Sequence, residues 1–498
     1  MKIFILIISI LFLNTLTYSQ DTKGKDSLKS ANNTLGKQVD NSKINDTLKH
    51  DSYHNMYGDL LNDDPAYNKK YPIWIPAARV FLANGFTLAV DRFVSNYDFS
   101  HISTESWKHN IKSGWEWDAD RFGINFIGHP YSGNNYFNIA RSNGYTYLQS
   151  FPFTVEGSLM WEFFGETTLP SKNDLINTTI SGSFLGEVLY RLSSNILDDR
   201  KKGSERVRNE ILAGLLDPTR ALNRLTQGKM KRVTTIDVYQ KEPLNLTLFG
   251  GIHKVNVNNQ FGTGATNEMF NIQFDYGDPF EKRSRKPFDV FRLRTEFSLG
   301  VGRKIIDNVT GYGILLGKTT REGRQGFLIG GFQHYDYWDN KLFELGSIGF
   351  GVGIIARTPV QQHSNIYSAV HFAIVPLAGN STRYGPDSSQ FRDYNFGGGL
   401  EGKIEETFNI NQWASSGFTG YYYYIHTYSG LPGNSLLGII KPKLSIQLYK
   451  NLSVGFEQQI YHNDRYLNHV DNLHVTRTEQ KFYLLLYLED ARRKGKYN

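Results

Sequence analysis

The chain has 498 residues, more than one ordinary domain holds, and predicts about three units at ~150 residues each. A net charge of only +7, with basic residues spread along the chain, argues against a nucleic-acid-binding protein. There are no cysteines, which excludes disulfides, thiol nucleophiles, Cys-ligated metal centres and a lipidated cysteine.

The first 20 residues have the pattern of a cleavable secretory signal. Lys2 supplies a short positive region, and the apolar run from Ile3 to Leu13 is too short for a spanning helix, which needs ~20 residues. A single N-terminal anchor helix is the alternative. Residues 21–70 predict a disordered linker, because a stretch rich in Lys, Asp, Ser, Asn and Thr cannot form a core.

Residues 71–228 predict a mixed module of helices and short strands. Alternation in GWEWDAD (114–120) and FGINFIGHP (122–130) has the period of two expected of strands. Helical spacing follows in SFLGEVLYRLSSNIL (183–197) and ERVRNEILAGLLDPTRALNRL (205–225). Ser171 and Asp217 stand where helix N-caps are expected, the second directly before Pro218.

From residue 229 to the C-terminus, about twelve segments alternate between apolar and polar side chains, as strands of transmembrane barrels do. The high content of Tyr (30) and Phe (33) fits the aromatic belts of such barrels. In FRLRTEFSLGV (291–301), Phe291 and Leu293 alternate with Arg292 and Arg294, which predicts an apolar outer face and a polar lumen. A soluble periplasmic β-sandwich is the alternative.

The predicted fold is therefore mixed. A C-terminal antiparallel transmembrane β-barrel of about 12 strands covers 229–498. An N-terminal, largely helical module packs in or against it. Export and the barrel together predict the cell outer membrane as the location.

Five segments of the module carry a family resemblance. They are GWEWDAD, HPYSGNNYFNIARSNG, GSLMWEFFGE, PSKNDLINTTISG and LGEVLYRLSSNIL. In this order they resemble domain of unknown function 3943, a family of uncharacterised proteins of Gram-negative bacteria, over about residues 83–197. The resemblance implies an exported, outer-membrane-associated protein and no particular activity.

The polar residues of this region allow a cation site. Asp118, Asp120 and His129, with Glu162 or Glu166, offer oxygen and imidazole ligands suited to divalent cations. No established metal-binding spacing is present, so neither a metal nor another cofactor is expected.

The same region also allows a serine hydrolase. Ser132 follows His129 by three residues, and Asp118 or Asn173 could orient the histidine. The pattern resembles only weakly that of outer-membrane phospholipases and lipid A deacylases, which carry His and Ser two apart on one strand. A spacing of three would point the two side chains apart on a strand.

A third interpretation is structural. Charged residues buried between helices must be paired, and arginine with carboxylate is the favoured pair. The residues expected in such a network are Asp120, Arg141, Glu162, Glu166, Asp174, Glu187 and Arg191.

The expected function is that of an outer-membrane protein that contacts membrane lipid and supports binding or passage of a lipid or small solute, with the helical module plugging or capping the barrel. The alternative is an outer-membrane hydrolase that acts on lipid esters through His129 and Ser132. A structural or adhesive surface protein is a third hypothesis. Nucleic acid is not an expected partner.

Overall fold

The structure is a computed structural model that describes residues 54–490, except 301–304, 341, 343, 362, 382–392, 412 and 469–470. The predicted signal peptide (1–20) and the predicted linker up to residue 53 lie outside the described residues. Residues 54–70, which the sequence places in the linker, are held by the rest of the molecule. The Tyr57 hydroxyl donates to Asp278 at 2.7 Å, and the Tyr190 hydroxyl donates to Asp63 at 2.6 Å.

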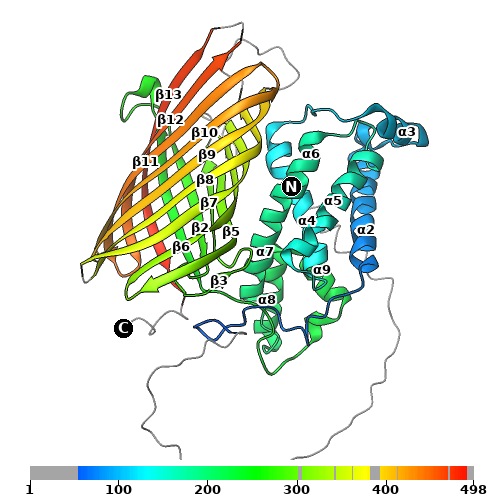
Figure 1. Ribbon diagram of the computed structural model, residues 1–498, viewed down its shortest axis with the longest axis horizontal. Helices are drawn as coiled ribbons and strands as arrows, with labels where there is room; N and C mark the ends of the chain where they lie inside the picture. The colour runs from blue at the N-terminus through cyan, green and yellow to red at the C-terminus, as the bar shows by residue number, and fades with distance from the viewer. Residues whose placement is uncertain are drawn as a thin grey trace, which may run out of the picture.

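Two parts stand side by side in Figure 1, a helical module and a barrel. The helical module comprises α2 (Trp74–Val90), η1 (Asp91–Ser95), η2 (Asp98–Ser100), α3 (Thr104–Ser113), η3 (Ile124–Gly128), α4 (His129–Arg141), α5 (Tyr147–Phe164), α6 (Lys172–Ile176), η4 (Asn177–Ser181), α7 (Gly182–Ile196), α8 (Gly203–Leu216), α9 (Pro218–Thr226) and η5 (Lys229–Lys231). None of the described helices combines the length and apolarity needed to cross a membrane.

Side-chain caps explain where several helices begin. The Ser171 and Asp217 side chains accept backbone N–H groups at the starts of α6 and α9, as the sequence predicts. Thr146 caps α5 in a capping box with Gln149. Close helix packing depends on glycine, since a Cβ on Gly133 of α4 would collide with the carbonyl oxygen of Thr178.

The strands predicted within the module are wrong. The described residues of the module contain no strand, only an isolated bridge between Glu116 and Ser171. Residues 124–128 form a π-helix that leads into α4. Phe122 and Phe126 pack with ring centroids 4.9 Å apart. Residues four apart lie on one face of a helix, but a spacing of four also fits the period of two expected of a strand. The sequence pattern therefore did not distinguish the two structures.

The second part is a closed antiparallel barrel. Its strands are β1 (Leu244–Val255), β2 (Thr266–Tyr276), β3 (Ser284–Arg285), β4 (Phe291–Leu299), β5 (Ile306–Glu322), β6 (Gln325–Asp339), β7 (Glu344–Gln361), β8 (Ser364–Ser381), β9 (Tyr394–Ile410), β10 (Ala414–Ser429), β11 (Gly433–Tyr449), β12 (Leu452–Leu467) and β13 (Leu473–Leu488). The two-residue β3 pairs only with β5. The other 12 strands close the cylinder, because β13 pairs with β1 and β5 pairs with β6.

The two ends of the barrel differ. At one end most connections are short, such as residues 323–324 between β5 and β6 and residues 450–451 between β11 and β12, although the 277–290 connection between β2 and β4 also lies there. The other end carries longer connections, such as 256–265 between β1 and β2 and 382–393 between β8 and β9. We call these the short-turn end and the long-loop end. In outer-membrane barrels the short turns face the periplasm.

Side chains of β4 alternate as the sequence predicts. Arg292 and Arg294 point into the lumen, where they meet Glu405 of β9 at 2.5 and 2.9 Å. Phe291 and Leu293 face outward into the main apolar core. Strands β5 to β8 stand between β4 and β9 one way round, so these ion pairs cross the lumen.

The helical module packs against the outer wall of this barrel. Phe184 of α7 and Phe122 contact the outward-facing Tyr335 and Tyr337 of β6, with ring centroids 5.7 and 5.6 Å apart. The Tyr335 hydroxyl donates to the Phe126 carbonyl. Of the two expected arrangements, in or against the barrel, the structure has the second. The expected role of the module in plugging or capping the barrel stays a prediction. A strand alternates between apolar and polar side chains in the same way whether helices or lipid cover its outer face. The sequence pattern therefore could not show which of them does.

Candidate functional site: an acidic centre in the helical module

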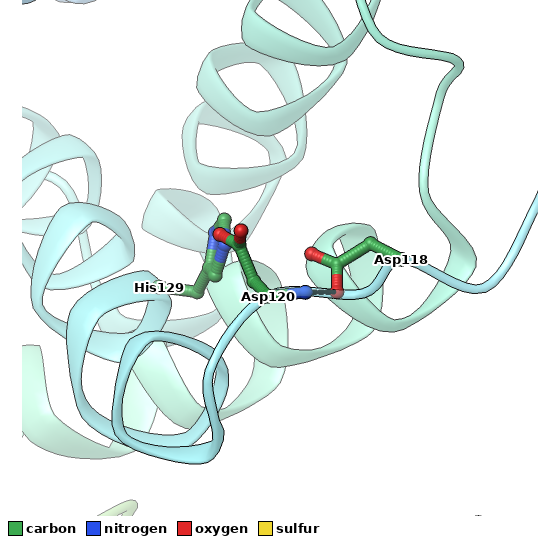
Figure 2. A group of neighbouring side chains, drawn as sticks. All are labelled: Asp118, Asp120 and His129. Atoms are coloured by element: carbon green, nitrogen blue, oxygen red, sulfur yellow. Dashed lines mark hydrogen bonds between the residues drawn. The ribbon is translucent and has the colours of Figure 1, made fainter. Parts of the chain in front are cut away.

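Asp118, Asp120 and His129 come together at the junction between the 115–121 loop and α4. One ligand atom from each lies within 4.8 Å of the others. Figure 2 shows the three side chains gathered beside one another. The Asp120 backbone N–H donates to Asp118 Oδ1 at 2.7 Å, which folds the loop so that both carboxylates face the histidine. The sequence placed these three residues in one candidate site.

Further carboxyl groups surround this trio. Asp174 Oδ1 lies 3.2 Å from His129 Nε2, and His129 Nδ1 lies 3.3 Å from the Thr178 hydroxyl. Glu162, only 1 % exposed, accepts the Ser171 backbone N–H at 2.6 Å. Asp118, Asp120, Asp174, Glu162 and Glu166 form what we call the acidic centre, together with His129.

Burial and mutual repulsion favour the protonated form of three carboxyl groups in the acidic centre, those of Glu162, Glu166 and Asp174. Desolvation raises the pKa of Glu162 to about 8, and the neighbouring Asp118 and Asp120 act in the same direction. Desolvation likewise raises the pKa of Glu166 and of Asp174 well above their ordinary values. Burial lowers the pKa of His129, so the imidazole is neutral at physiological pH. The centre therefore combines three carboxyl groups that keep their protons to higher pH, those of Glu162, Glu166 and Asp174, with a neutral imidazole.

Amide side chains and one barrel residue fix the geometry. Asn173 Oδ1 accepts the Asp118 backbone N–H at 3.1 Å, and Asn125 Nδ2 donates to Asp118 Oδ1 at 3.0 Å. Asn125 Nδ2 also donates to the Tyr394 hydroxyl at 2.6 Å, and that hydroxyl donates to the Asp120 carbonyl at 2.7 Å. Tyr394 stands at the start of β9, so the barrel wall braces the acidic centre.

Asn125, Thr178 and Tyr394 were not among the candidate residues of the sequence. Asn125 carries a usable signal, since it is a lone amide between apolar residues in FGINFIG. Tyr394 carries none, because its partner is 269 residues away in the chain.

Ser132 lies on the exposed face of α4. Within the described residues, His129 Nδ1 is hydrogen-bonded to the Thr178 hydroxyl and Nε2 lies 3.2 Å from Asp174, so neither ring nitrogen is directed at Ser132. The arrangement of His129 and Ser132 therefore differs from that of a serine hydrolase, in which the histidine contacts the nucleophile.

The structure brings Arg141, Glu187 and Arg191 together at the other end of α4 and α7. Glu187 is fully buried and accepts from Arg141 Nε at 2.6 Å and from Arg191 Nε at 2.8 Å. Arg191 also reaches Asp289, before β4, at 3.4 Å. We call this set the ion network. It joins α4, α7 and the barrel, while the acidic centre lies apart from it.

A known family model matches the segment that contains these residues. Residues 114–219 match the family model described as Domain of unknown function (DUF3943). The resemblance seen in the sequence is confirmed. The matched segment holds the acidic centre and, from the ion network, Arg141, Glu187 and Arg191. No curated protein matches the chain.

Among solved structures, the outer membrane channel DcaP of Acinetobacter baumannii is 12% identical, with 51% of this chain and 77% of that chain covered and a TM-score of 0.23. OmpT of Vibrio cholerae is 7% identical, with 49% and 96% covered and a TM-score of 0.18. The TodX monoaromatic hydrocarbon channel is 5% identical, with 51% and 91% covered and a TM-score of 0.19. Because these identities and TM-scores are so low, our description of the barrel rests on the strand pairing of this chain alone.

The barrel's own features place it in a bilayer. Its strands are even in number and antiparallel, and they close without an edge. Its outer face exposes large apolar side chains, among them Val352 at 65 %, Phe372 at 54 % and Phe482 at 53 %. Barrels of this class occur in outer membranes. The protein is an outer-membrane barrel.

Proposed function

We propose that the protein binds an outer-membrane lipid through its helical module, and that the barrel serves as the membrane anchor of this module. The observation that carries the proposal is the position of the module on the outer, lipid-facing wall. In this position, outward-facing side chains of the module would contact the bilayer rather than the periplasm or the exterior.

The filled lumen supports the same proposal. Glu405 and Lys403 are each 7 % exposed and Asp336 is 1 % exposed, although all three point inward. Lys403 Nζ lies 2.5 Å from Asp336, and Glu405 is paired across the lumen. Charges paired across a barrel interior leave little space for a solute at that level. The site of function is therefore sought outside the lumen.

The outer surface of the module supports contact with lipid. Helix α2 and the η1 turn after it expose Phe81 at 62 %, Leu82 at 56 %, Phe93 at 79 % and Val94 at 71 %. A group of large apolar side chains this exposed is uncommon on a water-facing surface and marks an interaction surface. Helix α2 lies on the side of the module away from the barrel (Figure 1), where acyl chains would surround an anchored module.

Tryptophan quenching tests the proposal. The full chain is reconstituted in vesicles of phospholipid with brominated acyl chains, which quench indole fluorescence on contact. Trp74 on α2 is 66 % exposed, whereas Trp338 is fully buried inside the barrel. We expect Trp74→Phe to remove a much larger share of the quenched signal than Trp338→Phe. Equal effects of the two substitutions would place the module in water and refute the proposal.

A second candidate function is hydrolysis of a lipid ester, favoured by the neutral imidazole of His129 among acids. Water would add to the ester carbonyl, His129 would take its proton, and the acyl C–O bond would break to release an acid and an alcohol. His129→Ala should abolish release of a fluorogenic acyl chain, while Ser132→Ala should keep it. Loss with both variants would instead support a serine nucleophile, and no release by the wild type would exclude the reaction for that ester.

A further inference from the structure

A cavity of about 630 Å³ lies below the ion network. Its walls come from the 62–70 segment, the ends of α4 and α7, the start of α5 and the connection between β2 and β4. That connection lies at the short-turn end of the barrel, where the chain also begins β1. The cavity therefore opens between module and barrel on the side that outer-membrane barrels turn to the periplasm.

Basic side chains dominate its lining. The six are Lys69, Lys70, Arg141, Arg191, Lys229 and Lys286. Two carboxylates, Asp63 and Glu187, also line the cavity. Six positive charges against two negative ones leave an excess of four.

The two carboxylates already have partners. Glu187 is shared by the two arginines, and Asp63 accepts the Tyr190 hydroxyl and the Gln240 backbone N–H. Both carboxylates are therefore held by other groups of the cavity wall, and neither forms an ion pair with a lysine of the cavity.

The hydrogen-bond partners of Lys70 and Lys286 are neutral. Lys70 Nζ donates to Gln149 at 3.2 Å and lies 4.4 Å from the Tyr145 ring centre. Lys286 Nζ donates to Asn62 at 3.1 Å. Within the described residues none of the four lysines has a carboxylate within ion-pair distance. Burial, with Arg232 and Arg224 nearby, lowers the pKa of Lys229 to about 8. An anion bound in the cavity would stabilise the charged form of Lys229 and raise its pKa again.

The rim of the cavity is apolar on the side away from the barrel. Leu148, which lines the cavity, is 72 % exposed. Lys69 and Lys70 are followed within one turn by Ile73 and Trp74, which are 69 % and 66 % exposed at the start of α2. Basic residues beside tryptophan and an apolar face mark the headgroup level of a bilayer.

We infer that this cavity binds the phosphate-bearing headgroup of an anionic lipid, with the acyl chains lying along Leu148 and the outer face of α2. The inference rests on the proposed function and specifies its ligand. Lys229 and Lys286 meet the phosphate from the module and from the barrel, and Lys69 and Lys70 close the outer side. Phosphate on a soluble molecule shares this chemistry, so the test separates the two sources.

The test measures lipid binding by the full chain in detergent micelles, titrated with phosphatidylglycerol, phosphatidylcholine or inorganic phosphate. The pocket variant is Lys229→Gln with Lys286→Gln. The matched control is Lys108→Gln with Lys112→Gln, which removes the same charge from exposed positions on α3. Gln keeps a polar side chain at each position, and tryptophan emission checks that each variant is folded.

We expect the wild type to prefer phosphatidylglycerol at least tenfold over phosphatidylcholine. The pocket variant should bind phosphatidylglycerol about 30-fold more weakly, about fivefold for each lysine. The control should bind as the wild type does. Equal losses in pocket variant and control would overturn the inference in favour of a bulk charge effect.

Three further outcomes are decisive. Binding of both lipids with equal affinity would overturn this inference and leave the proposed function standing. Binding of inorganic phosphate as tightly as phosphatidylglycerol, lost in the pocket variant, would overturn the lipid source and assign the cavity to a soluble phosphate compound. Binding of neither lipid would overturn the proposed function together with the inference.

Discussion

Replacing Glu162 by glutamine should remove a pH dependence that the wild-type helical module shows between pH 6.5 and 8. The pKa of Glu162 is raised from 4.5 to about 8 in the folded protein. Between these values the folded state keeps a proton that the unfolded state has lost. Stability is therefore full below pH 4.5, falls as the pH rises and reaches its minimum above pH 8.

The slope is about 1.4 kcal/mol per pH unit for each retained proton, which gives a loss of about 2 kcal/mol from pH 6.5 to 8 through Glu162 alone. Glu166 and Asp174 have raised pKa values and add to the same slope. The pKa of His129 is lowered from 6.5, so its opposite effect is confined to pH values below this window.

Urea unfolding in detergent, followed by tryptophan fluorescence, measures this slope. Five of the seven tryptophans belong to the module, namely Trp74, Trp107, Trp115, Trp117 and Trp161. A chelator keeps stray divalent cations from neutralising the carboxylates. Glu162→Gln should flatten the profile, and Glu205→Gln, on the exposed face of α8, should keep the wild-type slope.

A wild-type profile that is flat or rises with pH in this window would refute the reasoning. So would a Glu162→Gln variant with an unchanged slope, because the retained proton would then belong to another group. Addition of Mg²⁺ or Ca²⁺ extends the test. A cation bound at the acidic centre would stabilise the ionised carboxylates and abolish the wild-type slope.

Three further predictions concern single side chains. Gly133→Ala should destabilise the module by about 1–3 kcal/mol or prevent its folding, because the new Cβ meets the Thr178 carbonyl, whereas Gly85→Ala, with nothing near its Cβ, should be neutral or stabilising in thermal melts. Glu187→Gln should cost about 3–5 kcal/mol in urea titrations, because two buried arginines lose their shared carboxylate; a cost below about 1 kcal/mol would show that the network is solvated. Ser132→Ala should leave the midpoint of unfolding unchanged, because the side chain is exposed.

The barrel could be predicted from the sequence because its signal is local. In β4, Arg292 and Arg294 alternate with Phe291 and Leu293. The arginines point into the lumen and the apolar side chains point outward, as the alternation predicts. The position of the helices could not be predicted in this way. Tyr335 and Tyr337 alternate whether helices or lipid cover them, so no period distinguishes a helix inside the barrel from one outside.

The acidic centre was partly accessible to sequence reasoning. Asp118, Asp120 and His129 are close in the chain, and a helix start brings them together. Tyr394 was out of reach, since only the tertiary fold brings β9 to the 115–121 loop. The basic cavity was missed because its four lysines come from three separate segments and form no long run.

The helices on the outer wall determine how this protein can meet its neighbours in the membrane. Phe184, Phe122 and Trp117 cover part of the outer faces of β5, β6 and β9, at the long-loop end of these strands. A second barrel cannot dock on strands already occupied in this way. Self-association in the plane of the bilayer is therefore left to the parts of the wall that the module does not contact, such as the surface around the exposed Phe482 of β13.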